Sequence, residues 1–170
     1  MLSENESISV TMGELAASAC TELFDAYGVK LERSPAVWRE SEERRLCGVI
    51  GFVGRRVRGT CLLAANHEPL EESCPPEGRV RDWIGELANQ LLGRLKSKLL
   101  TRGLEVALTT PIVIAGVKLE PLPRGNLEPI VFRATKGNVL VWVEVEAEPG
   151  LEIGAESVAR VGGEGDILLF

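Results

Sequence analysis

The sequence predicts an α+β domain of two related halves, in which two long helices pack on an antiparallel β-sheet. Three observations support this fold class. Apolar residues recur at helical spacing in two segments, residues 11–26 and 79–102. Alternating apolar segments separated by short turns predict two hairpins. A five-residue motif in the first helix is echoed in the second, which indicates an internal repeat. The chain has 170 residues, enough for one domain with a sizeable core, and we predict a single domain over residues 1–170.

The first half begins with the predicted helix at residues 11–26, which Gly28 ends. The preceding residues, 1–7, are expected to be disordered. An extended segment around Pro35 follows. A hairpin comes next, and its two strands are predicted at residues 46–53 and 57–65.

The second half has the same order of elements. A Pro-rich and Glu-rich linker at residues 68–78 is expected to be a loop or a short helix. The helix at residues 79–102 has a close-to-ideal apolar stripe and is ended by Gly103. Strands are predicted at 104–108 and 111–119, and a loop at 121–129. A second hairpin is predicted at residues 130–135 and 139–146, and a Gly-rich C-terminal tail at residues 148–170, with a candidate short strand at 167–170.

The repeat relates the two helices directly. Gly13-Glu14-Leu15-Ala16-Ala17 in the first helix corresponds to Gly85-Glu86-Leu87-Ala88-Asn89 in the second. The two motifs share Gly, Glu, Leu and Ala and differ at the last position. The first helix therefore has a methyl group where the second has a carboxamide.

Composition excludes several classes of function. The formal net charge of −6 argues against a nucleic-acid-binding protein, which is usually basic. No apolar run reaches the roughly 18–20 residues that a membrane-spanning helix needs. The acidic start of the chain lacks the basic and apolar regions of a signal peptide, so we expect a cytoplasmic protein.

The four cysteines and the single histidine do not indicate a metal centre. Cys20, Cys47, Cys61 and Cys74 form no close C-x-x-C pair, so they are interpreted as small core residues. His67 lies in a polar turn with no nucleophile nearby in sequence, which makes it a weak candidate for acid–base catalysis. We expect no metal site and no cofactor of the protein's own.

The candidate site is a ridge on the second helix. Asp82, Glu86, Asn89 and Gly93 step by four, three and four residues, so they share one face opposite the apolar stripe. Such a face is often no more than solvated surface, and acidic residues near a helix start suit the helix dipole. Asn89 fits that interpretation poorly, because Asn is unfavourable in the middle of a helix.

These residues also carry a family resemblance. Glu86-x-x-Asn89, an acidic residue four positions before the Glu, and Pro111, 22 positions after the Asn, resemble the signature of the CheC/CheX/FliY family. That family comprises phosphatases of the phosphorylated chemotaxis response regulator CheY. The chain is most similar to CheX, and the similarity in order and spacing extends over residues 8–147.

The resemblance implies a fold, a partner and a mechanism. The substrate would be the aspartyl phosphate of a CheY-like receiver domain, whose own Mg²⁺ supports the reaction. Glu86 and Asn89 would be the catalytic pair: Asn89 would orient the attacking water and Glu86 would pair with the receiver's lysine. The partner-binding residues would be Asp82, Gln90 and Gly93, and Pro111 would be structural.

Other outcomes stay open at this stage. Ala17 cannot orient water, so one working site per chain is expected. The resemblance also implies a homodimer formed by joining sheet edges, for which residues 139–146 are one candidate edge. The alternative function is a non-catalytic receiver-binding adaptor or a flagellar-switch-like scaffold, which would use the same ridge to dock a partner without accelerating hydrolysis.

Overall fold

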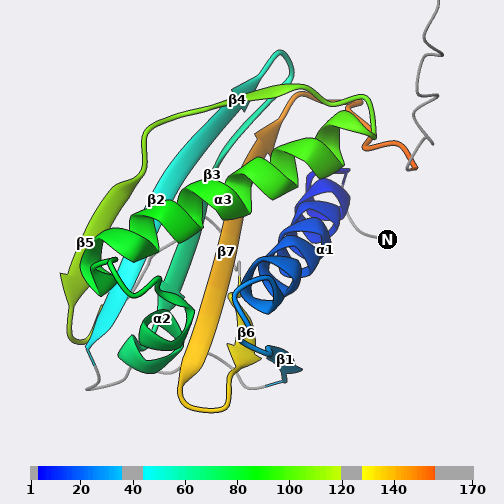
Figure 1. The fold of residues 1–170 in the computed structure, drawn as a ribbon. Helices are drawn as coiled ribbons and strands as arrows, with labels where there is room; N and C mark the ends of the chain where they lie inside the picture. The colour runs from blue at the N-terminus through cyan, green and yellow to red at the C-terminus, as the bar shows by residue number, and fades with distance from the viewer. Residues whose placement is uncertain (1–3, 36–43, 120–127, 156–170) are drawn as a thin grey trace, which may run out of the picture.

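The computed structural model describes residues 4–35, 44–119 and 128–155. Its described part consists of three helices on a seven-stranded antiparallel sheet, which confirms the predicted α+β class (Figure 1). In chain order the elements are α1 (Glu4–Asp25), β1 (Glu32–Ser34), β2 (Arg45–Gly54), β3 (Val57–Ala65), α2 (His67–Ser73), α3 (Val80–Leu100), β4 (Val106–Leu108), β5 (Ile112–Gly116), β6 (Ile130–Arg133) and β7 (Asn138–Ala147).

The strand order shows how the two halves are combined. The order across the sheet is β1-β6-β7-β3-β2-β4, and β5 also pairs with β2. If β1 corresponds to β4 and β5, and the hairpin β2–β3 to β6–β7, this order reads the same from both ends. Each half therefore donates its first strand to the hairpin of the other half: β1 pairs with β6, while β4 and β5 pair with β2.

The prediction that residues 139–146 form a free sheet edge for a dimer is wrong. Strand β7 pairs with β3 along Val139–Ala147 and with β6 along its first residues, so it lies inside the sheet. No residue of β7 is exposed, which fits that central position. The edge beyond β2 is formed by β4 and β5, and within the described ranges no other strand pairs with β5.

The helix boundaries differ from the prediction mainly at the N-terminus. Helix α1 begins at Glu4, so residues 4–7, expected to be disordered, belong to it. The buried side chain of Ile8 extends the apolar stripe one turn toward the N-terminus, and this explains the earlier start. The linker contains the short helix α2. The predicted loop at 121–129 lies mostly outside the described residues, as does most of the tail.

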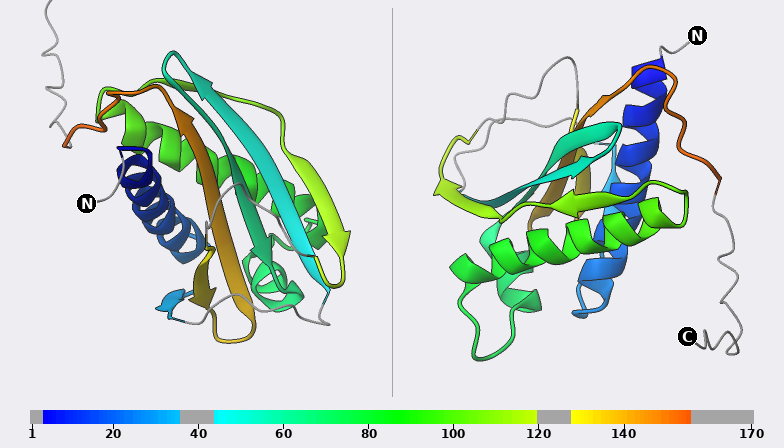
Figure 2. Two further views of the ribbon diagram at one scale, coloured as in Figure 1. Left: turned by 180° about the vertical axis from the view of Figure 1, so that it is seen from behind. Right: turned by 90° about the horizontal axis from the view of Figure 1, so that it is seen from above.

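The long helices α1 and α3 cover the same face of the sheet, as the two further views show (Figure 2). The core lies between this helical layer and the strands. Leu87, Leu91 and Leu95 of α3 are fully buried there, which stabilises the packing by about 1.5–3 kcal/mol for each side chain. Among the described helices, none is long and apolar enough to span a bilayer.

Candidate functional site

The predicted ridge forms on α3. Asp82, Glu86 and Asn89 are exposed and Gly93 is half-exposed, while Leu87 and Leu91 of the opposite face are buried. The structure thus brings the four ridge residues to one outer helix face, as the spacing predicts. Glu86 and Asn89 lie one turn apart there. The structure records no hydrogen bond for the Asn89 side chain within the described part of the chain.

Close contacts with the sheet fix α3 below this ridge. A Cβ atom added at Gly48 of β2 would lie 2.6 Å from the Cβ of Ala88 and 2.8 Å from the carbonyl oxygen of Ile84. One at Gly85 would lie 2.9 Å from the Cγ2 atom of Val113 in β5. Glycines at these two positions therefore let the helix backbone approach β2 and β5 closely, and this holds the ridge in a defined position.

Gln90 does not occupy the exposed crest with the other partner-binding candidates. It is half-buried beside Glu86, and its Nε2 atom donates a 3.0 Å hydrogen bond to the Oε1 atom of Glu86. Its Oε1 atom accepts a 2.9 Å hydrogen bond from the hydroxyl of Tyr27. Gln90 therefore connects the ridge to the turn that follows α1.

Sequence reasoning missed the residues below this connection. Tyr27 packs edge-on against Trp83, with ring centroids 4.9 Å apart, and the Nε1 atom of Trp83 donates to the Oγ atom of Ser73 at 3.0 Å. One signal was present in the sequence. Tyr27 is the chain's single tyrosine, and it directly precedes Gly28, the predicted helix stop.

The corresponding surface of α1 has different chemistry. Both carboxylate oxygens of Glu14 accept hydrogen bonds from Arg33, each at 2.8 Å. The hydrogen bond and charge of Arg33 hold the pKa of Glu14 below its usual value. Ala17 is buried, so this helix presents neither a free carboxylate nor an amide at the repeat positions.

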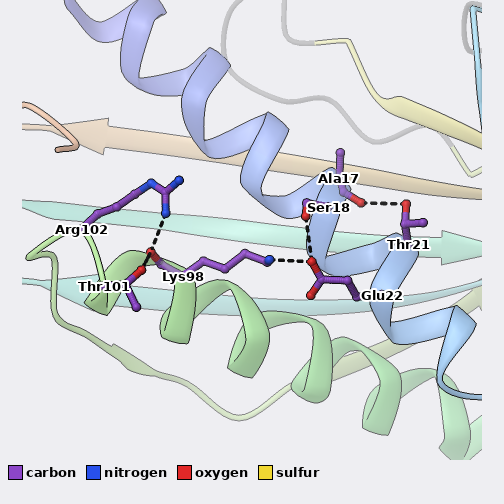
Figure 3. Close-up of polar contacts among 7 residues, drawn as sticks. All are labelled: Ala17, Ser18, Thr21, Glu22, Lys98, Thr101 and Arg102. Carbon is purple, nitrogen blue, oxygen red and sulfur yellow. Dashed lines mark hydrogen bonds and ion pairs between the residues drawn. The ribbon is translucent and has the colours of Figure 1, made fainter. Parts of the chain in front are cut away.

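Polar contacts join α1 to the C-terminal half of α3 (Figure 3). The Oε1 atom of Glu22 accepts hydrogen bonds from Lys98 at 2.6 Å and from Ser18 at 2.9 Å. The hydrogen bond from Lys98 is the main cause of a lowered pKa for Glu22. This contact fixes the two helices relative to each other at some distance from the Glu86–Asn89 pair.

The remaining candidates, Pro111 and His67, lie outside the ridge of α3. Pro111 lies between β4 and β5, next to the segment where the nitrogen of Thr109 donates to the carbonyl oxygen of Gly51 at 2.9 Å. His67 starts α2, and its Nδ1 atom lies 3.7 Å from the Oε2 atom of Glu71. Pro111 thus stands where the edge of the sheet passes from one short strand to the next.

Three of the four thiols are buried in the core, and Cys74 is half-buried. Cys20, Cys47 and Cys61 are buried, as expected for core residues. Burial raises the pKa of Cys47 to about 11 and that of Cys61 to about 12, so neither is a thiolate at neutral pH. In the described ranges, no group of three His, Cys, Asp or Glu side chains is arranged to hold a metal ion.

The sheet, the helical layer and the exposed acid–amide ridge define an α+β domain of the fold that the sequence resemblance implies. The model of the family described as chemotaxis phosphatase CheX matches residues 46–135, more than half of the chain. The chain therefore belongs to the CheX family. Among curated protein sequences, none matches it significantly.

Solved structures support the same fold. A CheX from Vibrio vulnificus superposes with a TM-score of 0.67 at 20% identity, covering 80% of this chain and 99% of that one. A CheC-like superfamily protein from Shewanella sp. PV-4 has a TM-score of 0.65 at 19% identity, covering 80% and 97%. A chain of the CheX–CheY–BeF3–Mg²⁺ complex from Borrelia burgdorferi has a TM-score of 0.61 at 14% identity, covering 78% and 96%.

Proposed function

We propose that this protein hydrolyses the aspartyl phosphate of a CheY-like receiver domain. In this reaction the oxygen of a water molecule forms a new bond to phosphorus, the bond from phosphorus to the aspartyl oxygen breaks, and inorganic phosphate and free aspartate are released. The observation that carries the proposal is the exposure of Glu86 and Asn89 one turn apart on α3. A side-chain pair on an open helix face fits insertion into a protein partner better than enclosure of a small molecule.

Asn89 orients the attacking water in this proposal. A carboxamide both donates and accepts hydrogen bonds, and it adds no charge next to the phosphoryl group. Its side chain is exposed, so it is available to a docked partner. Positioning of the water is the main task left to the phosphatase, because the receiver provides its own Mg²⁺ and acyl phosphate. No base from this chain is needed.

Glu86 pairs with the lysine of the receiver's active site and so sets the register of docking. A charge-assisted hydrogen bond between carboxylate and ammonium is strong and directional. Asp82 extends the acidic part of the ridge by one turn, and Gly93 leaves space for the receiver backbone, since nothing lies within 4 Å of a Cβ atom built there. The CheX–CheY complex among the similar structures supports this class of partner. The reaction takes place in the cytoplasm, where receiver domains are phosphorylated.

We place the contact of a homodimer at the β5 edge. Its exposed apolar side chains are Ile112, Val113 and Ile114, with 65%, 38% and 44% of their surface exposed. An exposed apolar edge strand favours pairing with a second copy. Light scattering after size-exclusion chromatography should give a dimer for the wild type and a monomer for Ile114→Lys. A wild-type monomer would contradict this part of the proposal.

The experiment that tests the activity follows the decay of a phosphorylated CheY-type receiver with Mg²⁺, alone and with each variant. Wild-type protein should accelerate the decay, and Asn89→Ala should remove roughly 10²-fold of that acceleration or more, with an unchanged fold by circular dichroism. Asn89→Asp keeps the size of the side chain but adds charge, and it should be equally impaired. Glu14→Gln, at the position of α1 that corresponds to Glu86, is the control outside the ridge and should retain full activity.

Two outcomes would contradict the proposal. Full activity in Asn89→Ala would show that Asn89 does not orient the attacking water. Tight binding of phosphorylated receivers without faster decay would identify the chain as a receiver-binding adaptor, which is the alternative function.

A further inference from the structure

Two hydrogen bonds link Tyr27 to Gln90 and Gln90 to Glu86, and the chemistry of the three side chains fixes which atoms donate and which accept. The carboxylate of Glu86 only accepts hydrogen bonds, so the Nε2 atom of Gln90 must face it, at 3.0 Å. The Oε1 atom of Gln90 then faces away, where it accepts the proton of the Tyr27 hydroxyl at 2.9 Å. A flipped carboxamide would place two acceptors against each other. Each end of the chain of hydrogen bonds therefore holds the other in one orientation.

Three helices support the base of this chain. The turn after α1 is closed by a 2.9 Å hydrogen bond from the nitrogen of Val29 to the carbonyl oxygen of Phe24, with Gly28 in the left-handed region at a φ of 80°. This turn presents the ring of Tyr27 to Trp83 of α3. Trp83 is itself held by Ser73 of α2. The Tyr27 hydroxyl is thus a fixed point relative to the ridge.

Solvent exposure of the side chains increases along the series of hydrogen bonds, from Tyr27 to Glu86. Tyr27 and Gln90 are half-buried, and Glu86 is exposed. An exposed Glu side chain normally samples several rotamers, and ordering it on binding costs free energy. Gln90 engages the Oε1 atom of Glu86, and this hydrogen bond restricts the rotamers of a side chain that is otherwise exposed to a docking partner.

We propose that Tyr27 and Gln90 are positioning residues that pre-organise Glu86 for docking of the phosphorylated receiver. This inference rests on the proposed function, and it assigns a task to the first half of the chain. The half without an exposed amide supplies, through Tyr27, the fixed end of the hydrogen-bonded chain that serves the other half. The hydrogen bonds from Tyr27 through Gln90 to Glu86 act on docking, so they affect KM for the phosphorylated receiver and leave kcat unchanged.

Two variants separate this role from simple packing. Tyr27→Phe keeps the ring against Trp83 and removes only the hydroxyl, so KM should rise by roughly two- to tenfold at unchanged kcat. Gln90→Glu keeps an acceptor for Tyr27 but removes the donor to Glu86 and adds a like charge. Its KM should rise at least as much. Arg33→Gln releases Glu14, the repeat counterpart of Glu86, and as the matched control it should leave KM unchanged.

A measurement on the unliganded protein is independent of activity. The Gln90 side-chain amide signals, identified by their absence from Gln90→Glu, should move toward solvent-exposed values in Tyr27→Phe. In the same variant, the three-bond scalar couplings of the Glu86 side chain should change from the values of a single rotamer to values averaged over several rotamers. Unchanged signals and couplings, an unchanged KM, or a lower kcat at constant KM in Tyr27→Phe would overturn the inference. Absence of phosphatase activity in the wild-type protein would contradict the proposed function. The side-chain couplings of Glu86 would still show whether Tyr27 orders Glu86.

Discussion

Helices α1 and α3 carry the same motif on the same face of one sheet, yet they present different chemistry. On α3, Glu86 and Asn89 are both exposed, and Glu86 accepts a hydrogen bond from the neutral side chain of Gln90 at one oxygen, Oε1. On α1, Arg33 occupies both oxygens of Glu14, and Ala17 is buried. The difference teaches that a shared motif is not enough for a site. The carboxylate must be oriented without being neutralised, and its neighbour must be exposed.

The helices also differ in how they meet the strands. Helix α3 lies on Gly48, where even one added carbon would meet the backbone of Ile84. At Gly13 of α1, an added Cβ atom would lie 3.6 Å from the Cδ1 atom of Ile130, an ordinary contact distance. At Gly85, the α3 counterpart of Gly13, the added Cβ atom would lie 2.9 Å from the Cγ2 atom of Val113, so α3 lies closer to its strand than α1 does at this pair of positions.

The largest expected effect comes from exchanging the amide between the two helices. A variant with Ala17→Asn and Asn89→Ala should stay roughly 10²-fold or more below wild type in receiver dephosphorylation, because position 17 is buried. Ala17→Asn alone should keep wild-type activity and lower the free energy of unfolding by about 1–3 kcal/mol, since a buried amide would lack partners. Phosphorylated-receiver decay and urea denaturation measure these effects. Activity in the exchanged variant would break the comparison.

The next effect concerns the seating of the helices. Gly48→Ala should lower the free energy of unfolding by about 1–3 kcal/mol, because the new methyl group forces α3 away from β2. Gly13→Ala should be neutral or stabilising by up to about 1 kcal/mol, as expected for a helical glycine with space around it. Thermal and urea unfolding of the two variants measure the difference. Equal destabilisation would show that both helices are seated alike.

A smaller effect separates stability from docking at Gly93. Gly93→Ala should raise the free energy of unfolding by up to about 1 kcal/mol, since alanine is the better helix former and the added methyl group meets nothing. If the receiver backbone docks there, KM for the phosphorylated receiver should rise several-fold in the same variant. Steady-state kinetics check this, with Gly13→Ala as control. An unchanged KM would place Gly93 outside the docking surface.

The smallest effect tests the ion pair of α1. Arg33→Ala should lower the free energy of unfolding by less than about 1 kcal/mol at pH 7, because both partners are more than half exposed. Arg33 lowers the pKa of Glu14 in the folded state, so this stabilisation is present above the unfolded pKa, about 4.3, and is lost as pH falls through the folded value. Unfolding curves of wild type and variant should converge once the pH lies below the lowered folded-state pKa of Glu14. A constant difference at all pH values would assign the effect to packing.

Features that depend on local periodicity were predicted well. The stripe from Val80 to Leu99 defines α3 within two residues at each end, and the ridge follows from the spacing of its polar residues. Both hairpins form as predicted, since alternation and short turns are local signals. The resemblance to the CheC/CheX/FliY family added the expected class of function.

Features that depend on contacts between the halves were not predicted. The pairing of β1 with β6 joins residues about a hundred positions apart, and no local pattern specifies it. The position of β7 inside the sheet is a consequence of the same exchange. The resemblance implied a partner-binding role for Gln90 but specified none of its contacts within the chain. Its contact with Tyr27 arises where the end of α1 meets α3.

The exchange of strands between the halves has a consequence for synthesis. As the chain emerges from the ribosome, β1 and β3 are complete long before β6 and β7, with which they pair. The edge of β3 that later pairs with β7 is therefore unpartnered until the last described strand, ending at Ala147, has been made. Pairings at such long sequence separation slow folding and expose nascent strands to aggregation. The nascent first half therefore exposes unpaired strand edges for longer than the second half does.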